Sequence, residues 1–437
     1  MRHAHDRELT GEQIGSSLYG LRLMRNKTKF VENGTVTMGN SIGPSSADLH
    51  RKNLDALGGV EGLLDAFAEK IRESSAHLDS KNIGMALFSL KGMNSDSKVV
   101  QNLLVELEKK IRQSKAELNC QSTGMALYGL QNMRSDNSAV QGVLKALTEK
   151  IYQSCIEFDG RAIGDSLYGL KGMSSESPAV QDILRALEKK IRQSRAELSE
   201  QGIGMALFGL QNMGSDNSAV LGVLDALSLK LRSSSAEISG KNIGMALFGL
   251  KGMNSDSKVV QNLLVELEKK IRQSKAELNC QSAGMALYGL QNMRSDHIEV
   301  QGVLEALTEK INASSAEFDG RAIGDSLYGL KGMNSESPAV QDILSALATK
   351  IRQSKAEFNR QILVMALCGL QRMGTDNSAV QEVFEALAEK ISKSSVDFEG
   401  PETIDSRFEV RGISSDSPAV QDMFLKLQDK IRERSST

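Results

Sequence analysis

The sequence has few of the residues that disulfide-bonded or membrane-inserted proteins use. Its 437 residues include no tryptophan and only four cysteines, and two of these, Cys120 and Cys280, are one position duplicated. Because the cysteines follow no pairing pattern, we expect reduced thiols in a cell interior. No run approaches the about 18 apolar residues of a membrane span, and the opening "MRHAHDRELT" lacks the apolar core of a signal peptide. These absences predict an intracellular protein, in the cytoplasm, an organelle or a host cell, with no membrane partner.

An excess of charge and the usual catalytic signatures are also missing. The net charge is −2, so the chain as a whole exerts no attraction on nucleic acid. None of the five histidines pairs with a cysteine or a carboxylate at metal-ligand spacing. No nucleophile elbow, phosphate-binding glycine loop or HExxH motif occurs. We therefore expect no enzymatic activity, no metal, no cofactor and no small-molecule substrate.

What the sequence does contain is one motif repeated every 40 residues. The glycine of "IGMALFGL" recurs through seven copies, and a lysine near the end of each copy recurs through ten, from Lys70 to Lys430. Gly15 and Lys70 are 55 residues apart, whereas Gly84 and Lys110 are 26 apart, so the first copy carries a 29-residue insertion. Residues 81–120 match residues 241–280 at all but one position, which indicates duplication of four-repeat blocks. A fixed period of this length is typical of a solenoid.

Each repeat has the apolar spacing of two helices, which we name helix A and helix B. In the copy that begins at residue 161, the first pattern runs from Ile163 to Met173 and the second from Val180 to Ile191. Helix A is preceded in nearly every copy by a residue that favours the N-cap position. These residues are Asp79, Asn119, Asp159, Ser199, Ser239, Asn279, Asp319 and Asn359. Glycines inside helix A, such as Gly204 and Gly209, predict close approach of neighbouring A helices, which would offset their helix-breaking cost.

The predicted fold is therefore all-α, a superhelical α-solenoid of about ten helical hairpins. We expect an N-terminal repeat with its insertion at residues 1–80, eight repeats at 81–400, and a degenerate C-terminal cap at 401–437, where Arg407 replaces a leucine. Asn33-Gly34, between alternating β-formers in the insertion, predicts a small β-hairpin that either caps the end or touches a partner.

Four positions on one face of helix A vary between repeats, and we call them the stripe. In order along the chain they are Lys81, Met85, Phe88, Gly92; Gln121, Met125, Tyr128, Asn132; Arg161, Asp165, Tyr168, Gly172; Gln201, Met205, Phe208, Asn212; Lys241, Met245, Phe248, Gly252; Gln281, Met285, Tyr288, Asn292; Arg321, Asp325, Tyr328, Gly332; and Gln361, Met365, Cys368, Arg372. An aromatic ring beside an amide or a cation suits stacking on a nucleic-acid base and bonding of its edge. The same group suits a peptide, and the rings could instead pack against helix B of the next repeat.

The recurring lysines of helix B form a second candidate surface, the lysine ladder. Its members include Lys110, Lys150, Lys190, Lys230, Lys270, Lys310 and Lys350. Such a ladder could contact phosphates. Alternatively, a cation in the last turn simply complements the helix dipole, by about 0.3–1 kcal/mol.

The helix A motif resembles a known family. The strings "EQIGSSLYGLRLM" from residue 12, "GRAIGDSLYGLKGM" from 160 and "EQGIGMALFGLQNM" from 200 are similar to the repeat signature of octotricopeptide and heptatricopeptide proteins. The resemblance covers residues 10–437 and implies an α-solenoid that binds single-stranded RNA, usually in organelles, with some bacterial relatives among presumed secreted effectors.

Two hypotheses follow for the function of the chain. The first is sequence-selective binding of single-stranded RNA along the stripe, about one base per repeat, with the aromatic rings stacking on bases and a four-nucleotide period in the preferred RNA. The second is a protein–protein scaffold of the HEAT or armadillo kind, for example a bacterial effector that grips a protein or peptide through the same surface.

Overall fold

The computed structural model describes residues 8–20, 59–394 and 417–435. Every regular element in these ranges is a helix. The predicted β-hairpin at Asn33-Gly34 lies outside the described residues, as do Arg407 and residues 401–416 of the predicted C-terminal cap. None of the helices in the described ranges combines the length and the apolar content that crossing a membrane requires.

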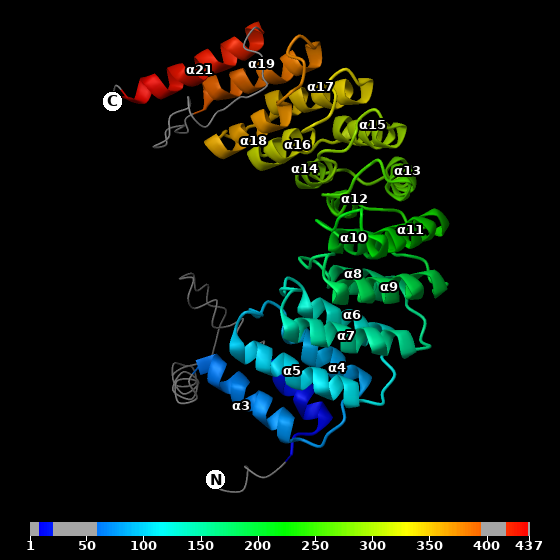
Figure 1. The fold of residues 1–437 in the computed structure, drawn as a ribbon. Coiled ribbons are helices and arrows are strands. Elements are labelled where there is room, and N and C mark those ends of the chain that lie inside the picture. The colour runs from blue at the N-terminus through cyan, green and yellow to red at the C-terminus, as the bar shows by residue number, and fades with distance from the viewer. Residues whose placement is uncertain (1–7, 21–58, 395–416, 436–437) are drawn as a thin grey trace. The chain divides into compact units, whose positions relative to one another are not determined.

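Eight complete helix pairs follow one another within residues 80–393 (Figure 1). The A helices are α4 (Ser80–Phe88), α6 (Cys120–Leu130), α8 (Gly160–Tyr168), α10 (Glu200–Gly209), α12 (Gly240–Phe248), α14 (Cys280–Gly289), α16 (Gly320–Gly329) and α18 (Arg360–Leu370). Their B partners are α5 (Lys98–Gln113), α7 (Ser138–Gln153), α9 (Pro178–Gln193), α11 (Ser218–Ser233), α13 (Lys258–Gln273), α15 (Ile298–Ala313), α17 (Pro338–Gln353) and α19 (Ser378–Lys393). Two further B helices, α3 (Gly59–Glu73) and α21 (Pro418–Ser435), flank them, and residues 11–20 are helical. The all-α repeat fold predicted from the period is confirmed.

The chain divides into two units, Met1–Ala196 and Glu197–Thr437. Within each unit, every A helix packs on the A helix of the next repeat and every B helix on the next B helix, so each unit has an A layer and a B layer (Figure 1). The apolar positions of both helices are buried, for example Leu247 in α12 and Leu263 and Leu267 in α13. Because most of the packing joins neighbouring repeats, a single pair could not bury enough apolar surface to fold alone.

The helix boundaries follow from capping residues. The Asp79 carboxylate accepts the N–H of Asn82 at 2.7 Å, and the predicted N-cap side chains bond in this way in seven of the eight A helices. In α12, the Ser239 hydroxyl instead accepts from the Asn242 side chain at 2.9 Å. Pro178 begins α9 and Pro338 begins α17, at positions where the missing N–H has no helical partner to lose.

Glycine in helix A allows the close approach that the sequence predicted. A Cβ on Gly289 would overlap the backbone of Leu247, in the preceding A helix. The same overlap with the preceding A helix would occur at Gly129, Gly169, Gly249, Gly329 and Gly369. These A helices are therefore in backbone contact, and the six glycines leave no room there for a side chain.

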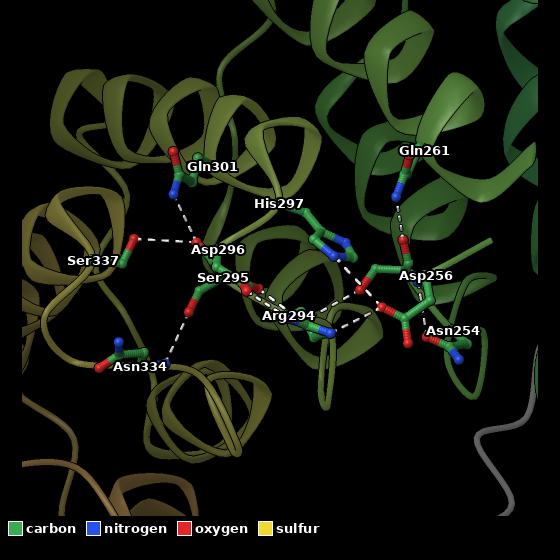
Figure 2. Close-up of polar contacts among 11 residues, drawn as sticks. Asn254, Asp256, Gln261, Arg294, Ser295, Asp296, His297, Gln301, Asn334 and Ser337 are labelled. Carbon is green, nitrogen blue, oxygen red and sulfur yellow. Dashed lines mark hydrogen bonds and ion pairs between the residues drawn. The ribbon is translucent and has the colours of Figure 1, made fainter. Parts of the chain in front are cut away.

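The turns between helices A and B are joined from repeat to repeat by buried serines. The Ser295 hydroxyl accepts the N–H of Asn334 in the following turn at 2.8 Å, and its carbonyl accepts from the Gln301 side chain at 2.8 Å (Figure 2). Equivalent bonds join Arg294 to Ser255 and Asn254 to Ser215. This network satisfies the backbone groups of the turns and fixes the spacing between successive repeats.

Candidate functional site

The stripe lies on the exposed side of the A helices. Its first position, occupied by Lys81 or an equivalent residue, is solvent-exposed in all eight repeats, and so is its last position. The two middle positions, represented by Met85 and Phe88, are half-buried in every repeat. The stripe is therefore a continuous accessible surface within each unit, with an apolar centre and polar borders.

The aromatic residues of the stripe stack on one another. In the first unit, the ring centroids of Phe88 and Tyr128 are 5.8 Å apart and those of Tyr128 and Tyr168 are 5.3 Å apart. In the second unit, the three successive spacings from Phe208 to Tyr328 are 5.5, 5.6 and 5.3 Å. Stacked bases are about 3.4 Å apart, so a base between two rings needs a gap of about 6.8 Å. These columns leave no such gap.

This arrangement corrects one role expected from the sequence. The rings do not present free faces on which one base per repeat could stack, because each face inside a column is covered by the neighbouring ring. Nor does Phe88 depend on helix B of the next repeat for its contact, since it stacks on Tyr128 of the next helix A. The columns form instead a rigid apolar floor along the stripe.

A row of lysines beside the columns was missed by the sequence reasoning. Lys91 places Nζ 4.0 Å from the ring centroid of Tyr128 and donates to its hydroxyl at 2.8 Å, and Lys251 places Nζ 4.8 Å from the ring centroid of Tyr288. Lys171 and Lys331 lie 5.8 and 5.5 Å from the rings of their own repeats. Burial lowers the pKa of Lys171. The alternation of "GLKGM" and "GLQNM" in the sequence was the signal that could have revealed these residues.

The last stripe position has left-handed backbone in every repeat. Asn132, Asn212 and Asn292 have φ of 61°, 62° and 63°, and glycine occupies the position in the alternate repeats. Asparagine and glycine are the residues that adopt this conformation at least cost. The backbone N–H of Asn132 donates to the Lys171 carbonyl at 2.8 Å, which joins one turn to the next.

Two carboxylates interrupt the stripe at the position that methionine holds elsewhere. The Arg161 guanidinium lies 3.5 Å from Asp165, and Arg321 lies 3.6 Å from Asp325. Burial raises the pKa of both carboxyls, and the adjacent arginine offsets only part of this effect.

The stripe carries positive charge although the chain does not. We call Lys91, Lys171, Lys251 and Lys331 the turn lysines. Together with them, the stripe holds nine cationic side chains, against the two carboxylates of Asp165 and Asp325. The cations are Lys81, Lys91, Arg161, Lys171, Lys241, Lys251, Arg321, Lys331 and Arg372. The net charge of −2 therefore hides a surface that suits a polyanion.

The lysine ladder, in contrast, is not a surface. Lys270 is buried, and its Nζ donates to the Ser234 carbonyl at 2.5 Å, just beyond the end of helix B of the preceding repeat. The same bond to the preceding repeat is made by Lys110, Lys150, Lys190, Lys310, Lys350 and Lys390. Lys230 is half-buried. The hypothesis that the ladder contacts phosphates is wrong for these bonded lysines, because their ammonium groups already cap helix ends. These bonds join each lysine to the preceding repeat, a contact that neither reading of the ladder from the sequence included.

No group of three or more metal-ligating side chains is clustered in the part of the chain that the structure describes. The four cysteines all have free thiols. Nothing in the described ranges adds a second candidate site to the stripe.

The chain shows similarity to known proteins only among solved structures. No protein-family model matches the sequence, and no curated protein matches it. Yeast Rmd9p in complex with a 16-nt target RNA aligns with 97% of this chain and 81% of its own, at 10% identity and a TM-score of 0.28. The pentatricopeptide repeat protein PPR10 in complex with an 18-nt psaJ RNA element aligns with 87% of this chain and 58% of its own, at 12% identity and a TM-score of 0.25. TM-scores this low do not establish a shared ligand, so the function must be argued from the stripe itself.

Proposed function

We propose that the chain is a non-catalytic, octotricopeptide-like repeat protein that binds single-stranded RNA along the stripe. The observation that carries this proposal is the excess of cations on an exposed surface that continues from repeat to repeat. Lysine and arginine neutralise phosphates, and this sequence-independent attraction supplies most of the affinity in nucleic-acid binding. A protein partner would not require such an excess on a chain whose total charge is −2.

The spacing of the rings favours an extended, unstacked single strand. Successive rings of the stripe are 5.3–5.8 Å apart, whereas a stacked strand advances by about 3.4 Å per nucleotide. A strand that advances one nucleotide per repeat must therefore be extended, with its bases separated. Separated bases expose the edges on which proteins read RNA sequence.

Each part of the stripe has a role in this proposal. Exposed cations such as Lys81 and Arg161, with turn lysines such as Lys91, contact phosphates. The aromatic columns and the methionines form the apolar floor against which the strand lies. Exposed amides, represented by Gln121 and Asn132, bond base edges. We propose an intracellular site of action.

Binding of short labelled RNA to the purified chain tests this function. We expect saturable binding to single-stranded RNA that weakens steeply with salt, weaker binding to duplex RNA of equal length, and photocrosslinks in peptides that contain Tyr128 or Tyr288. A capture from total cell lysate, with bound RNA and bound protein both identified, distinguishes the rival. One stoichiometric protein partner, with no RNA above background at low salt, would overturn the RNA proposal in favour of a scaffold.

A further inference from the structure

Three positions of the stripe region alternate in phase between successive repeats. The first-turn residue is cationic in Lys81, Arg161, Lys241 and Arg321, and glutamine in the four repeats between them. The residue after helix A is lysine in the cationic repeats, for example Lys91, and glutamine in the others. The left-handed position is glycine in the cationic repeats and asparagine in three of the other four. The surface unit is therefore a pair of repeats.

Each cationic repeat has one positive group at the start of the exposed face of helix A and a second one just after its end. In the repeat of α12, Lys241 is exposed at the start of the helix, and Lys251 follows its end with Nζ 4.8 Å from the ring centroid of Tyr288. Ammonium and guanidinium groups only donate hydrogen bonds. Every phosphate oxygen accepts them, so a cation that contacts the backbone of the strand distinguishes no base.

Amide repeats place neutral groups at the same points. In the repeat of α14, Gln281 and Asn292 are exposed, and Gln291 is half-buried. An amide both donates and accepts, and it can therefore discriminate among base edges that differ in their donor and acceptor groups. Asn292 has φ of 63° and the equivalent Gly252 has φ of 87°, so both repeat types have a left-handed residue at this position.

Resting on the proposed function, we infer that the two repeat types divide the work of binding RNA. Cationic repeats hold phosphates without selecting a base, and amide repeats read the base that faces them. Sequence information in the preferred RNA thus recurs with a period of two repeats. Every second cationic repeat also carries Asp165 or Asp325 beside its arginine. This carboxylate lowers the positive charge of the repeat, and base selection stays with the amide repeats.

Selection from a random RNA library, followed by exchange of one repeat's identity, tests this inference. The triple variant Gln281→Lys, Gln291→Lys, Asn292→Gly converts an amide repeat into the type that already stands on both sides of it. We expect the parent to select alternating informative and uninformative nucleotides. In the variant, one informative position is lost, with roughly tenfold or greater loss of discrimination there, while affinity for unselected RNA stays equal or increases. The matched control is Lys241→Arg, an exchange within the cationic class, which keeps the parental motif.

The reverse exchange gives a second, independent variant, so that a folding defect in the first one does not decide the test. Lys241→Gln, Lys251→Gln, Gly252→Asn creates an additional amide repeat, and we expect a new informative nucleotide. Equal information at consecutive nucleotides in the parent, or an unchanged motif in both exchange variants, would overturn the two-repeat period while RNA binding itself stands. Failure of the parent to bind any single-stranded RNA at low salt would instead overturn the proposed function, and the period with it.

Discussion

Lys270 caps a helix that belongs to the repeat before its own. Its Nζ lies 2.5 Å from the Ser234 carbonyl oxygen and 3.1 Å from that of Ala236, both just beyond the end of α11. Ser234 is the C-cap of α11 and has extended backbone, so these carbonyls belong to the segment that leaves the helix, where no helical N–H bonds them. One buried ammonium group therefore bonds two carbonyls of the preceding repeat. The stacking of the two repeats thus depends on this charge.

Removal of this cap should destabilise the array. We expect Lys270→Met to lower the free energy of unfolding by about 1.5–3 kcal/mol, because carbonyls that accept from a buried cation lose their partner. Lys269→Met is the matched control. Lys269 is 55% exposed and pairs with the half-buried Glu266, so its loss should cost less, about 1 kcal/mol. Urea unfolding of both variants measures the difference. Equal effects would show that Lys270 has no special role.

The close approach of the A helices predicts an unusual sensitivity to one methyl group. Gly289→Ala would place Cβ against the backbone of Leu247, which cannot move aside without shifting α12. We expect a loss of about 1–3 kcal/mol or more in the free energy of unfolding. Gly142→Ala is the control, because the added Cβ meets only the end of the flexible Glu108 side chain, and alanine favours the helix by up to about 1 kcal/mol. Thermal unfolding of the two variants should therefore shift in opposite directions.

Sequence periodicity predicted everything that is decided within one repeat. The two helices, the N-cap at Asp79 and the proline at the start of α9 depend on local chemistry and on a spacing of 3.6 residues. The glycine contact between A helices is an exception, which was predicted across repeats because glycine inside a helix is costly unless a neighbouring backbone lies against it. Which side chains face a neighbouring repeat depends instead on how repeats stack, and the period does not contain that information.

The two errors about the site have this cause. Lys110 looks like a surface residue from its own helix, yet the preceding repeat covers it. Phe88 looks available for stacking, yet Tyr128 occupies its face. Lys91 was overlooked because it lies beyond helix A, and only the stacked turn brings it to the ring of the next repeat.

The stripe carboxylates should make stability depend on pH in a defined direction. Burial raises the native pKa of Asp165 and Asp325. Such groups cost nothing below the unfolded pKa of about 3.9, where both states are protonated, and they reduce stability as pH rises through the native pKa. The double variant Asp165→Asn, Asp325→Asn should therefore unfold at higher urea than the parent at pH 7, with a gain that vanishes at pH 3.

Two other aspartates give a control of opposite sign. Hydrogen bonds from Arg134 and Arg294 lower the pKa of Asp136 and Asp296. A lowered pKa contributes stability that is present above the unfolded value and lost as pH falls through the native value. Asp136→Asn with Asp296→Asn should thus unfold at lower urea than the parent at pH 7. If both double variants unfolded at higher urea than the parent, the gain in stability would come from the loss of negative charge in general. That outcome would contradict the role assigned to burial of Asp165 and Asp325.

The turn lysines should set the salt dependence of RNA binding. For single strands, the slope of log affinity against log salt changes by about 0.7 for each phosphate contact. Replacing Lys91, Lys171, Lys251 and Lys331 with glutamine, the residue that the alternate repeats carry at this position, should therefore make the slope shallower by about 2.8. Binding titrations across a series of salt concentrations measure it.

Four lysines of the B layer provide a control with the same change in net charge. Lys109, Lys145, Lys189 and Lys269 are exposed on helix B, away from the stripe. Their replacement with glutamine should weaken binding slightly through the overall field and leave the slope unchanged, because they contact no phosphate in the proposed complex. Equal slopes for the two quadruple variants would place the RNA elsewhere on the molecule. A reduced slope for the turn-lysine variant alone would place its backbone between the A-helix ends and the turns, where the cationic repeats hold it.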